Sequence, residues 1–212
     1  METDQTKVWT GDFGKDYTSR NTYKSIDGFN QAYIDYYGKT KDDLNKEILS
    51  NLPKNLKILE VGSNVGYQLA SLQRFGFSNL YGIEIQRECV EQSKKLWKGI
   101  DIVQASAFDI PFKDNYFDLV FTNNVLIHIS PDDIDIVLNE MNRVSSKYIY
   151  GFGYYSEKYE RIEYRNNLNL MWKTDFSNLF LKKFSNLKSI FSKKYPCLNF
   201  KGNTDKAYIL EK

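Results

Sequence analysis

Short apolar runs separated by longer amphipathic stretches fill the middle of the chain. The apolar runs predict β-strands at residues 56–61, 79–84, 101–104, 117–122 and 147–152. Between them, apolar residues at helical spacing predict helices at residues 66–75, 86–97 and 131–144, the last opened by Pro131 behind the N-cap Ser130. Strands that alternate with helices at this interval favour an α/β fold with a parallel sheet and crossover helices.

The segment before this core has a different pattern. Residues 1–25 are polar and aromatic, and we expect an ordered cap or a short helix there. Residues 27–50 predict two helices with a break near Gly38, the second capped by Thr40 with Asp43 as the capping-box acid. We therefore divide a single domain into an N-terminal helical cap, residues 1–50, and a core, residues 51–212.

The pattern changes again after the fifth predicted strand. Thr174 and Asp175 open a predicted helix at residues 174–184, and further strands are predicted at 187–191 and 206–211. The chain shows neither an internal repeat nor a linker rich in proline and serine. A second domain is therefore not expected.

Composition and charge exclude several classes of protein. The 29 basic and 27 acidic residues give a net charge of +2, which is too balanced for a dedicated nucleic-acid binder. Cys89 and Cys197 lie far apart and form no metal-ligand pattern, so we expect no metal and a reducing, cytoplasmic compartment. No apolar run reaches the roughly 18 residues of a membrane span, and the first residues do not resemble a signal peptide.

The candidate chemistry begins where the first predicted strand ends. Glu60 closes that strand, Gly62 and Gly66 lie in the loop after it, and a helix follows. The next strand ends in a second acid, Glu84. Glycines allow the backbone to approach a ligand closely, and a carboxylate can accept hydrogen bonds from two ribose hydroxyls. The sequence therefore predicts a nucleoside site at this edge of the sheet.

The spacing of the glycines distinguishes between cofactors. The loop has the order E-x-G-x-N-x-G, in which Asn64 stands where a dinucleotide site has its middle glycine, so an NAD(P) oxidoreductase is disfavoured. The segment 60–66 instead resembles the first motif of class I S-adenosylmethionine (SAM)-dependent methyltransferases, and Glu84 resembles their ribose-binding acid. The resemblance implies a Rossmann-like fold, with a mostly parallel seven-stranded sheet and an antiparallel C-terminal strand.

The same resemblance implies which residues hold the cofactor. In this family SAM is the cofactor, S-adenosyl-L-homocysteine is the product, and no metal is needed. The loop after the third strand packs on the adenine, usually with an acid where this chain has Ser106, whose hydroxyl can still bond an adenine nitrogen. The fourth strand ends beside the expected methyl group. The residues expected at the cofactor are Glu60, Gly62, Ser63, Asn64, Gly66, Glu84, Ile85, Ser106, Ala107, Phe108 and Asn123.

His128 is the only histidine of the chain and follows the fourth predicted strand. A histidine can take a proton from an acceptor hydroxyl near neutral pH, which is the step that O-methylation needs. His128 is therefore the candidate catalytic base. The alternative is that it packs between Ile127 and Ile129 or bonds only to nearby backbone.

Both flanks of the core resemble a narrower family. Residues 9–21 resemble the N-terminal signature of the pseudaminic acid biosynthesis-associated methylases, which are bacterial SAM-dependent enzymes found with surface-sugar pathways. Residues 154–176 resemble the same family, although Asn166 and Asn167 stand where that family usually has a histidine. Together with the SAM motifs, the resemblance covers most of the chain, and it leaves the acceptor open.

Arginines and aromatic residues in these flanks are candidates for ligand binding. Arg20 and Arg165 lie among aromatic residues, where their forked donors can hold a carboxylate or a phosphate. For Lys173 a solvated helix end is the simpler alternative, and for the aromatic residues of the cap core packing is an equal alternative. We expect Tyr17 and Arg20 to contact the cofactor, and the acceptor to contact Tyr154, Tyr155, Arg165 and Lys173.

These patterns predict a SAM-dependent methyltransferase that acts on the oxygen or nitrogen of a small polar acceptor. The flanks favour an acceptor from bacterial surface-glycan biosynthesis, of the flagellar, capsular or pseudaminic type, such as a nucleotide-activated sugar. The alternatives are a methyltransferase acting on another small molecule or on a protein, and a catalytically silent SAM-binding subunit. The acceptor, the methylated atom and the oligomeric state stay open.

Overall fold

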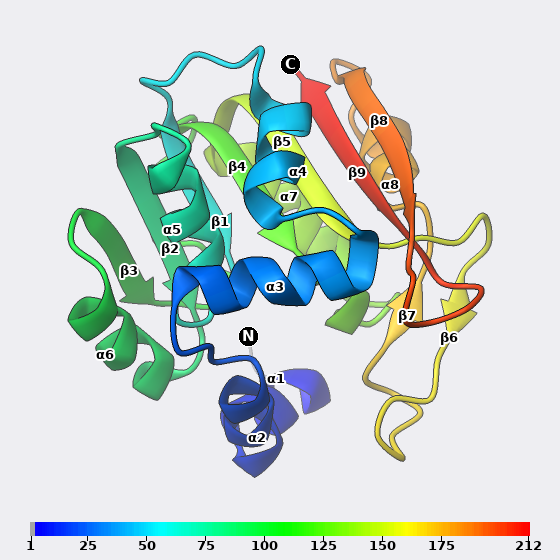
Figure 1. Cartoon of the computed structure of the whole chain (residues 1–212). Coiled ribbons are helices and arrows are strands. Elements are labelled where there is room, and N and C mark those ends of the chain that lie inside the picture. Colours follow the sequence, from blue (N-terminus) through cyan, green and yellow to red (C-terminus); the bar gives the residue numbers. More distant parts are fainter. Residues whose placement is uncertain (1–2) are drawn as a thin grey trace.

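The computed structural model describes residues 3–212, and a mixed sheet lies at its centre (Figure 1). Seven strands follow the order β3-β2-β1-β4-β5-β9-β8. The first five are parallel, β9 is antiparallel to β5, and β8 is antiparallel to β9. The strands are β1 Lys57–Val61, β2 Asn79–Glu84, β3 Ile100–Gln104, β4 Phe117–Asn123, β5 Ser145–Tyr154, β8 Lys188–Pro196 and β9 Thr204–Glu211. This topology confirms the predicted Rossmann-like methyltransferase fold.

Helices cover both faces of the sheet (Figure 1). Helices α4 (Lys41–Leu49), α5 (Tyr67–Arg74) and α6 (Arg87–Leu96) lie on one face, and α7 (Ile134–Val144) and α8 (Phe176–Lys183) lie on the other. Successive strand residues face opposite layers: Ile58 packs in the cluster of α4 and α5, whereas Leu59 packs in the cluster of α7 and α8.

The N-terminal segment is helical, as predicted. It forms α1 (Asp4–Thr10), α2 (Asp12–Arg20) and α3 (Ile26–Tyr37), and Gly38 ends α3 in the left-handed conformation with φ 69°. Thr40 caps α4, and its side chain forms the predicted capping box with Asp43. Helices α1 and α2 lie beyond the carboxyl ends of the strands, and α3 crosses in front of the sheet (Figure 1).

Several predicted boundaries differ from the structure. Helix α7 begins at Ile134 behind Asp133, and not at Pro131, because the amide of Asp132 and the Ser130 hydroxyl first close a turn. Strands β8 and β9 are longer than predicted. Strand β8 is an exposed edge of serines and lysines, so it lacks the apolar alternation that would have marked its full length.

A small hairpin between β5 and α8 escaped prediction. It consists of β6 (Glu160–Arg161) and β7 (Trp172–Lys173), and a short 3₁₀ helix η1 (Leu126–His128) follows β4. Two-residue strands carry too few positions for a recognisable pattern. Helix α8 agrees with prediction, since the Asp175 side chain caps it by accepting from the amide of Asn178.

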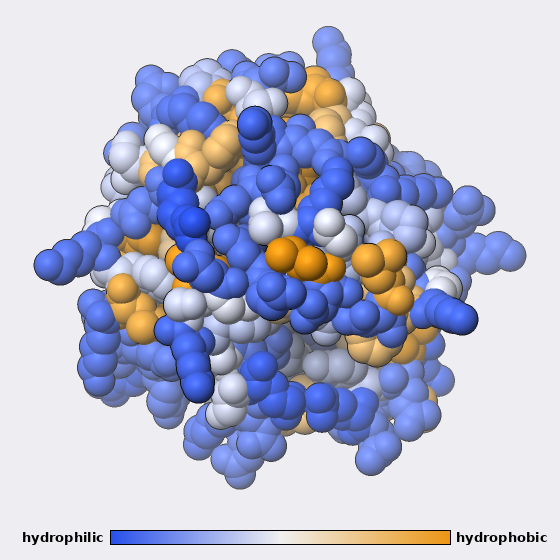
Figure 2. All heavy atoms as spheres, viewed as in Figure 1, coloured by the Kyte–Doolittle hydropathy of each residue, from blue (hydrophilic) through white to orange (hydrophobic). Residues whose placement is uncertain are grey.

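The surface over α3 to α6 is mostly hydrophilic, with small separate apolar patches (Figure 2). Large apolar side chains that stay exposed include Ile34, Leu198 and Phe200. Scattered exposure of this kind is ordinary for a folded domain. Within residues 3–212, every helix is too short or too polar to cross a membrane.

Candidate active site

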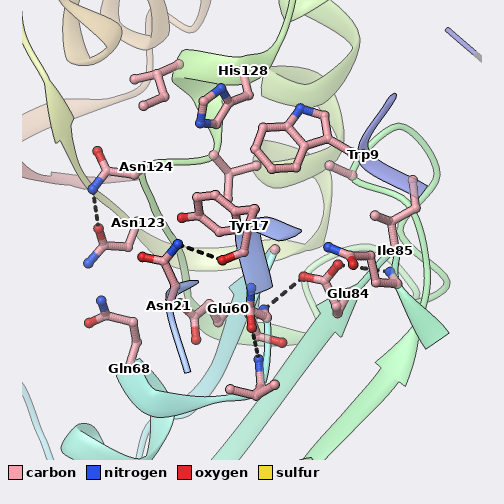
Figure 3. Close-up of a pocket in the computed structure, with 18 of the residues that line it drawn as sticks. Trp9, Tyr17, Asn21, Glu60, Gln68, Glu84, Ile85, Asn123, Asn124 and His128 are labelled. Atoms are coloured by element: carbon pink, nitrogen blue, oxygen red, sulfur yellow. Dashed lines mark hydrogen bonds between the residues drawn. The ribbon is translucent and has the colours of Figure 1, made fainter. Parts of the chain in front are cut away.

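A cavity of about 530 Å³ lies at the carboxyl ends of β1, β2 and β4 (Figure 3). The loops after these strands form its floor, and residues of α1, α2, α3 and the β6–β7 segment form its roof. Strand β1 lies between β2 and β4, which is where the strand order reverses. Ligands of open α/β sheets bind at such a switch point, and the volume suits a small molecule.

The loop after β1 has a conformation that its glycines permit. Gly62 and Gly66 have φ values of 74° and 92°, and Asn64 has φ 49°. A Cβ atom at Gly62 would lie 2.5 Å from a methyl group of Val125, so packing behind the loop, as well as the backbone angle, requires glycine there. The amides of Gly62 and Ser63 both donate to the carbonyl of Ile83, which holds the loop on β2.

Glu84 is buried at the end of β2 and is held by backbone donors. Its two carboxylate oxygens accept from the amides of Asn64, at 2.8 Å, and Gln86, at 2.9 Å. Burial raises the pKa of Glu84, and these backbone hydrogen bonds oppose the rise. A carboxylate has about four acceptor sites, so Glu84 can still accept from two ligand hydroxyls.

Three residues that line the cavity have a buried acceptor atom without a partner. The atoms are Oε2 of Glu60, Oε1 of Gln68 and Oδ1 of Asn124, and none accepts a hydrogen bond from any of residues 3–212. The amide nitrogens of Gln68 and Asn123 donate to the hydroxyl of Tyr33, at 2.6 and 3.1 Å, so this tyrosine orients both side chains. Unsatisfied buried acceptors are costly, and a ligand that brings hydrogen-bond donors would satisfy them.

All the other expected cofactor residues except Gly66 also line the cavity. Ser106 lies in the wall, and its Oγ accepts from the amide of Phe108 at 3.2 Å, which leaves its O–H free to donate to a ligand. The lining further contains Gly62, Ser63, Asn64, Ile85, Ala107, Phe108, Tyr17 and Arg20. Gly66 does not line it. A Cβ at Gly66 would lie 2.9 Å from Ile102, so this glycine lets the start of α5 pack on β3.

His128 lines the cavity and also bonds the backbone, so both interpretations from the sequence describe part of its environment. Its Nδ1 lies 2.6 Å from the carbonyl oxygen of Leu170. The ring centre of Trp9 lies 4.5 Å from that of His128, and Tyr164 packs nearby at 5.5 Å. Burial lowers the pKa of His128 to about 4, against the opposing effect of the Leu170 carbonyl. The ring is therefore neutral at pH 7, with its proton on Nδ1 and Nε2 as the acceptor.

The roof of the cavity is tied to its floor by Thr18, a residue that sequence reasoning missed. The Thr18 hydroxyl on α2 accepts from the side-chain amides of Asn64, at 3.2 Å, and Gln86, at 3.4 Å. The same hydroxyl lies 3.2 Å from the sulfur of Cys89. No local pattern around Thr18 marks it, because its partners lie 46 to 71 residues away.

Of the four residues expected at the acceptor, two line the cavity and two do not. Tyr154 and Arg165 line the cavity, whereas Tyr155 and Lys173 do not. Successive side chains of an extended segment point to opposite sides, and the Tyr155 ring lies under the ammonium of Lys194 at 4.1 Å. The Lys173 ammonium donates to Asn203.

Two arginines in the roof of the cavity are not paired with acids in the described part of the chain. They are Arg20 and Arg165, and both line the cavity. Arg165 and Asn166 have left-handed backbone conformations, with φ 49° and 63°, at the tip of the β6–β7 segment. Their free guanidinium groups give this end of the cavity a positive character.

Comparison with known proteins agrees with this geometry. Residues 59–147 match a family model described as a methyltransferase domain. Similar solved structures include 1,6-didemethyltoxoflavin-N1-methyltransferase of Burkholderia thailandensis, at 13% identity and TM-score 0.71, covering 100% of this chain and 91% of that one. No curated protein sequence matches the chain.

Two further structures show how widely this fold is used. Magnesium protoporphyrin IX methyltransferase of Synechocystis PCC 6803 has 13% identity and TM-score 0.69, over 100% of this chain and 98% of that one. The [4+2]-cyclase SpnF has 13% identity and TM-score 0.65, over 81% and 80%. At such identities the likeness establishes the fold, and the chemistry depends on the site.

The span matched by the family model contains the loop after β1, Glu84, Asn123 and His128. Together with the sheet order, this match defines a class I methyltransferase domain. Residues 59–147 thus carry a methyltransferase domain, and the sheet around them has the Rossmann-like fold of SAM-dependent methyltransferases.

The residues of the cavity fit SAM. The free acceptor sites of Glu84 suit the ribose diol, and the unpartnered oxygens of Glu60 and Gln68 suit the α-ammonium of the methionine part. No cluster of three or more potential metal ligands occurs within residues 3–212. The hydrogen-bond acceptors of the cavity wall therefore suit the hydrogen-bond donors of SAM.

The burial of His128 and its hydrogen bond to Leu170 predict the protonation state and the tautomer of its ring. Since its pKa is about 4, the ring should stay neutral from pH 8 down to about pH 5, with the proton on Nδ1. Because the chain has a single histidine, nitrogen NMR of a histidine-labelled sample reports this residue alone. A titration midpoint between pH 6 and 7 would contradict the burial of this ring and its hydrogen bond to the Leu170 carbonyl.

Proposed function

We propose that this enzyme transfers the methyl group of SAM to an oxygen or nitrogen of a small, polar, anionic acceptor. The supporting observation is the single cavity in which the acids of the strand ends meet the free guanidinium groups of Arg20 and Arg165. The resemblance of both flanks to surface-sugar methylases favours a nucleotide-activated sugar of bacterial surface-glycan biosynthesis. Both methyltransferases of similar structure are named for small-molecule substrates.

Each part of the cavity has a role in this proposal. Bound SAM supplies an electrophilic methyl group. Glu84 binds the ribose hydroxyls, and Glu60 with Gln68 binds the α-ammonium. Ser106, Ala107 and Phe108 contact the adenine, and Asn123 lies beside the methyl group. The protein mainly aligns the reacting atoms, which lowers such barriers by up to ~7–11 kcal/mol in favourable cases.

His128 completes the mechanism for a hydroxyl acceptor. Nε2 of His128 would take the proton of the acceptor hydroxyl as the methyl group is transferred and S-adenosyl-L-homocysteine is released. The Leu170 carbonyl fixes the tautomer that leaves Nε2 as the proton acceptor. An amine acceptor can arrive unprotonated and needs alignment more than proton removal.

The N-terminal residues 1–50 act as a cap on the SAM-binding core of residues 51–212. Trp9 and Tyr17 lie in the roof of the cavity, and Thr18 contacts the loops that carry Asn64 and Gln86. These contacts would exclude water from the cofactor once it is bound. The alternatives, another small-molecule or protein substrate and a catalytically silent SAM-binding subunit, lack a comparable observation in their favour.

Replacement of Glu84 by alanine should weaken SAM binding. The lost hydrogen bonds to the ribose correspond to ~1.5–3 kcal/mol, the usual range for bonds to a charged group. Calorimetry with SAM on the folded variant measures the loss. Glu88→Ala removes an exposed acid four residues further on and should bind SAM normally. Equal affinities for wild type and Glu84→Ala would exclude Glu84 from the site.

SAM should order the cap. Amide hydrogen exchange of residues 9–21 should slow when the cofactor is added, because the cap then closes on an occupied cavity. Helix α8 lies on the far side of the sheet, and its exchange serves as the internal control. Equal protection of residues 9–21 with and without SAM would make this segment a permanent part of the scaffold.

Methyl transfer itself is tested by incubation with SAM and a panel of nucleotide-activated sugars. Mass spectrometry should detect one product heavier by a single methyl group, and its fragments locate the methylated atom. With a hydroxyl acceptor, His128→Gln should lower the transfer rate by ~10²–10⁴-fold, the usual contribution of a positioned base. Its SAM affinity should be unchanged. A normal rate in this variant would leave His128 an orienting role only.

A further inference from the structure

The mouth of the cavity is formed by two arginines and two aromatic residues. Most residues that line the cavity are buried or half-buried, and those of residues 3–212 that are exposed are Arg20, Tyr36, Arg165 and Phe200. Tyr36 is 37% exposed and Phe200 is 48% exposed. A residue that lines a cavity and is also open to solvent lies where the cavity opens. A ligand that enters therefore first meets guanidinium groups and aromatic rings.

The two aromatic rings lie side by side although they are far apart in the sequence. Tyr36 belongs to the last turn of α3, and Phe200 belongs to the loop between β8 and β9, residues 197–203. Their ring centres are 6.0 Å apart, and their planes differ by 20°. The neighbouring residues Ile34 and Leu198 are also exposed, but they do not line the cavity. The place of the parallel pair at the mouth distinguishes it from scattered apolar exposure.

Hydrogen bonds hold Phe200 in this position. The amide of Leu198 donates to the carbonyl of Tyr36 at 2.8 Å, which joins the loop to α3. Within the loop, the amide of Asn203 donates to the carbonyl of Phe200 at 2.9 Å. The Lys173 ammonium donates to the side chain of Asn203, which joins the loop to β7. The aromatic pair is therefore formed before a ligand binds, so a ligand loses little affinity to the ordering of the loop.

The aromatic pair is separate from the residues expected at the adenine of the cofactor. Residues 106–108 follow β3, at one end of the strand order, whereas the β8–β9 loop belongs to the strands at the other end. Asp205 at the start of β9 pairs with Tyr154 at the end of β5, so this loop still lies at the carboxyl ends of the parallel strands. The cavity thus has two regions that suit a planar ring, and SAM carries one such ring.

The chemistry of the mouth suits the two parts of a nucleotide. Aromatic side chains bind nucleobases by stacking, because every base has a π face. The guanidinium groups of Arg20 and Arg165 are free of ion pairs in the described chain, and such groups bind phosphate through parallel hydrogen bonds. The candidate base His128 lies inside the cavity and is 8% exposed. An acceptor anchored at the mouth must therefore extend inwards, as a sugar joined to a nucleotide does.

We propose that Tyr36 and Phe200 form a subsite for the nucleobase of a nucleotide-linked acceptor, with Arg165 at its phosphates. The inference rests on the proposed function, because it requires an acceptor that binds beside SAM. Among small anionic acceptors, the subsite selects those that carry a planar base at the end remote from the methylated atom. A sugar phosphate without a base makes no contact with the aromatic pair.

Calorimetry on the full chain, saturated with S-adenosyl-L-homocysteine, tests the subsite. The probes are the diphosphates of uridine, cytidine, adenosine and guanosine, together with pyrophosphate, which carries the anion without the base. Saturation of the cofactor site keeps adenosine diphosphate out of it. At least one nucleotide should bind the wild type. Phe200→Ala should weaken the binding of this nucleotide by ~10–100-fold, the usual contribution of one stacked base, and leave pyrophosphate binding unchanged.

Further variants separate stacking from other effects. Tyr36→Phe keeps the ring and should bind the nucleotide as the wild type does. Arg165→Asn, which suits the left-handed backbone at this position, should weaken the binding of nucleotide and pyrophosphate alike. Leu198→Ala removes an apolar side chain of the same loop that is 61% exposed and does not line the cavity, and it should match the wild type. Affinity for S-adenosyl-L-homocysteine should be the same in all these variants.

Several outcomes would overturn the proposal. Wild-type nucleotide affinity in Phe200→Ala would do so, and so would equal losses for the nucleotide and for pyrophosphate. If S-adenosyl-L-homocysteine binds the wild type and none of the four nucleotides does, the cofactor site stands and the subsite fails. Methylation of a sugar phosphate that lacks a base, at the same KM in the wild type and in Phe200→Ala, would keep the proposed function and remove the subsite. If S-adenosyl-L-homocysteine does not bind, the proposed function fails together with the subsite.

Discussion

A carboxylate that is buried without a neighbouring cation must be held by hydrogen-bond donors, and Glu84 is such a group. Within residues 3–212 it has no ion pair, and the amides of Asn64 and Gln86 donate to its two oxygens. These amides belong to the loops after β1 and β2, so one carboxylate fixes both loops relative to each other. The same two residues also donate through their side chains to Thr18, which places α2 over the cavity. The roof of the site thus depends on the acid in its floor.

The two acids of the site are stabilised in different ways, and the difference matches what each can bind. Glu84 is surrounded by fixed backbone dipoles, which suit uncharged hydroxyl donors. Glu60 has an oxygen without a hydrogen-bond partner, which suits a donor from a ligand. His128 is a third case, since burial makes it neutral and one carbonyl sets its tautomer. In all three groups burial shifts the pKa, upwards for the two acids and downwards for the histidine.

Much of this arrangement was predictable from local sequence. The five parallel strands were predicted to within a few residues, because each is a short apolar run bounded by polar residues. The loop after β1 and Glu84 were found from a spacing that the backbone conformation itself requires. The class of protein followed from those few residues.

The rest depends on contacts between distant parts of the chain, which a local pattern does not encode. From the sequence, Lys41 is expected to be an exposed residue in the first turn of a helix. In the structure it is buried, because Tyr33 of α3 and Phe152 of β5 pack around its ammonium group. Thr18 has no neighbour in sequence that points to the cofactor loops. Tyr155 and Lys173 were expected at the acceptor, but neither lines the cavity. Tyr155 packs against Lys194 of β8, and Lys173 donates to Asn203, just before β9.

The position of β9 has a consequence for how the molecule is made. This strand follows β8 in the sequence, yet it lies inside the sheet, between β5 and β8, and Tyr208 packs closely against Gly151. During synthesis on the ribosome, β1 to β5 can pair as they emerge, whereas β5 keeps an open edge until residues 204–211 leave the exit tunnel. The nascent chain therefore carries an unpaired strand edge for as long as it takes to translate residues 155–203. Pairing that edge is the last step by which the newborn chain closes its sheet.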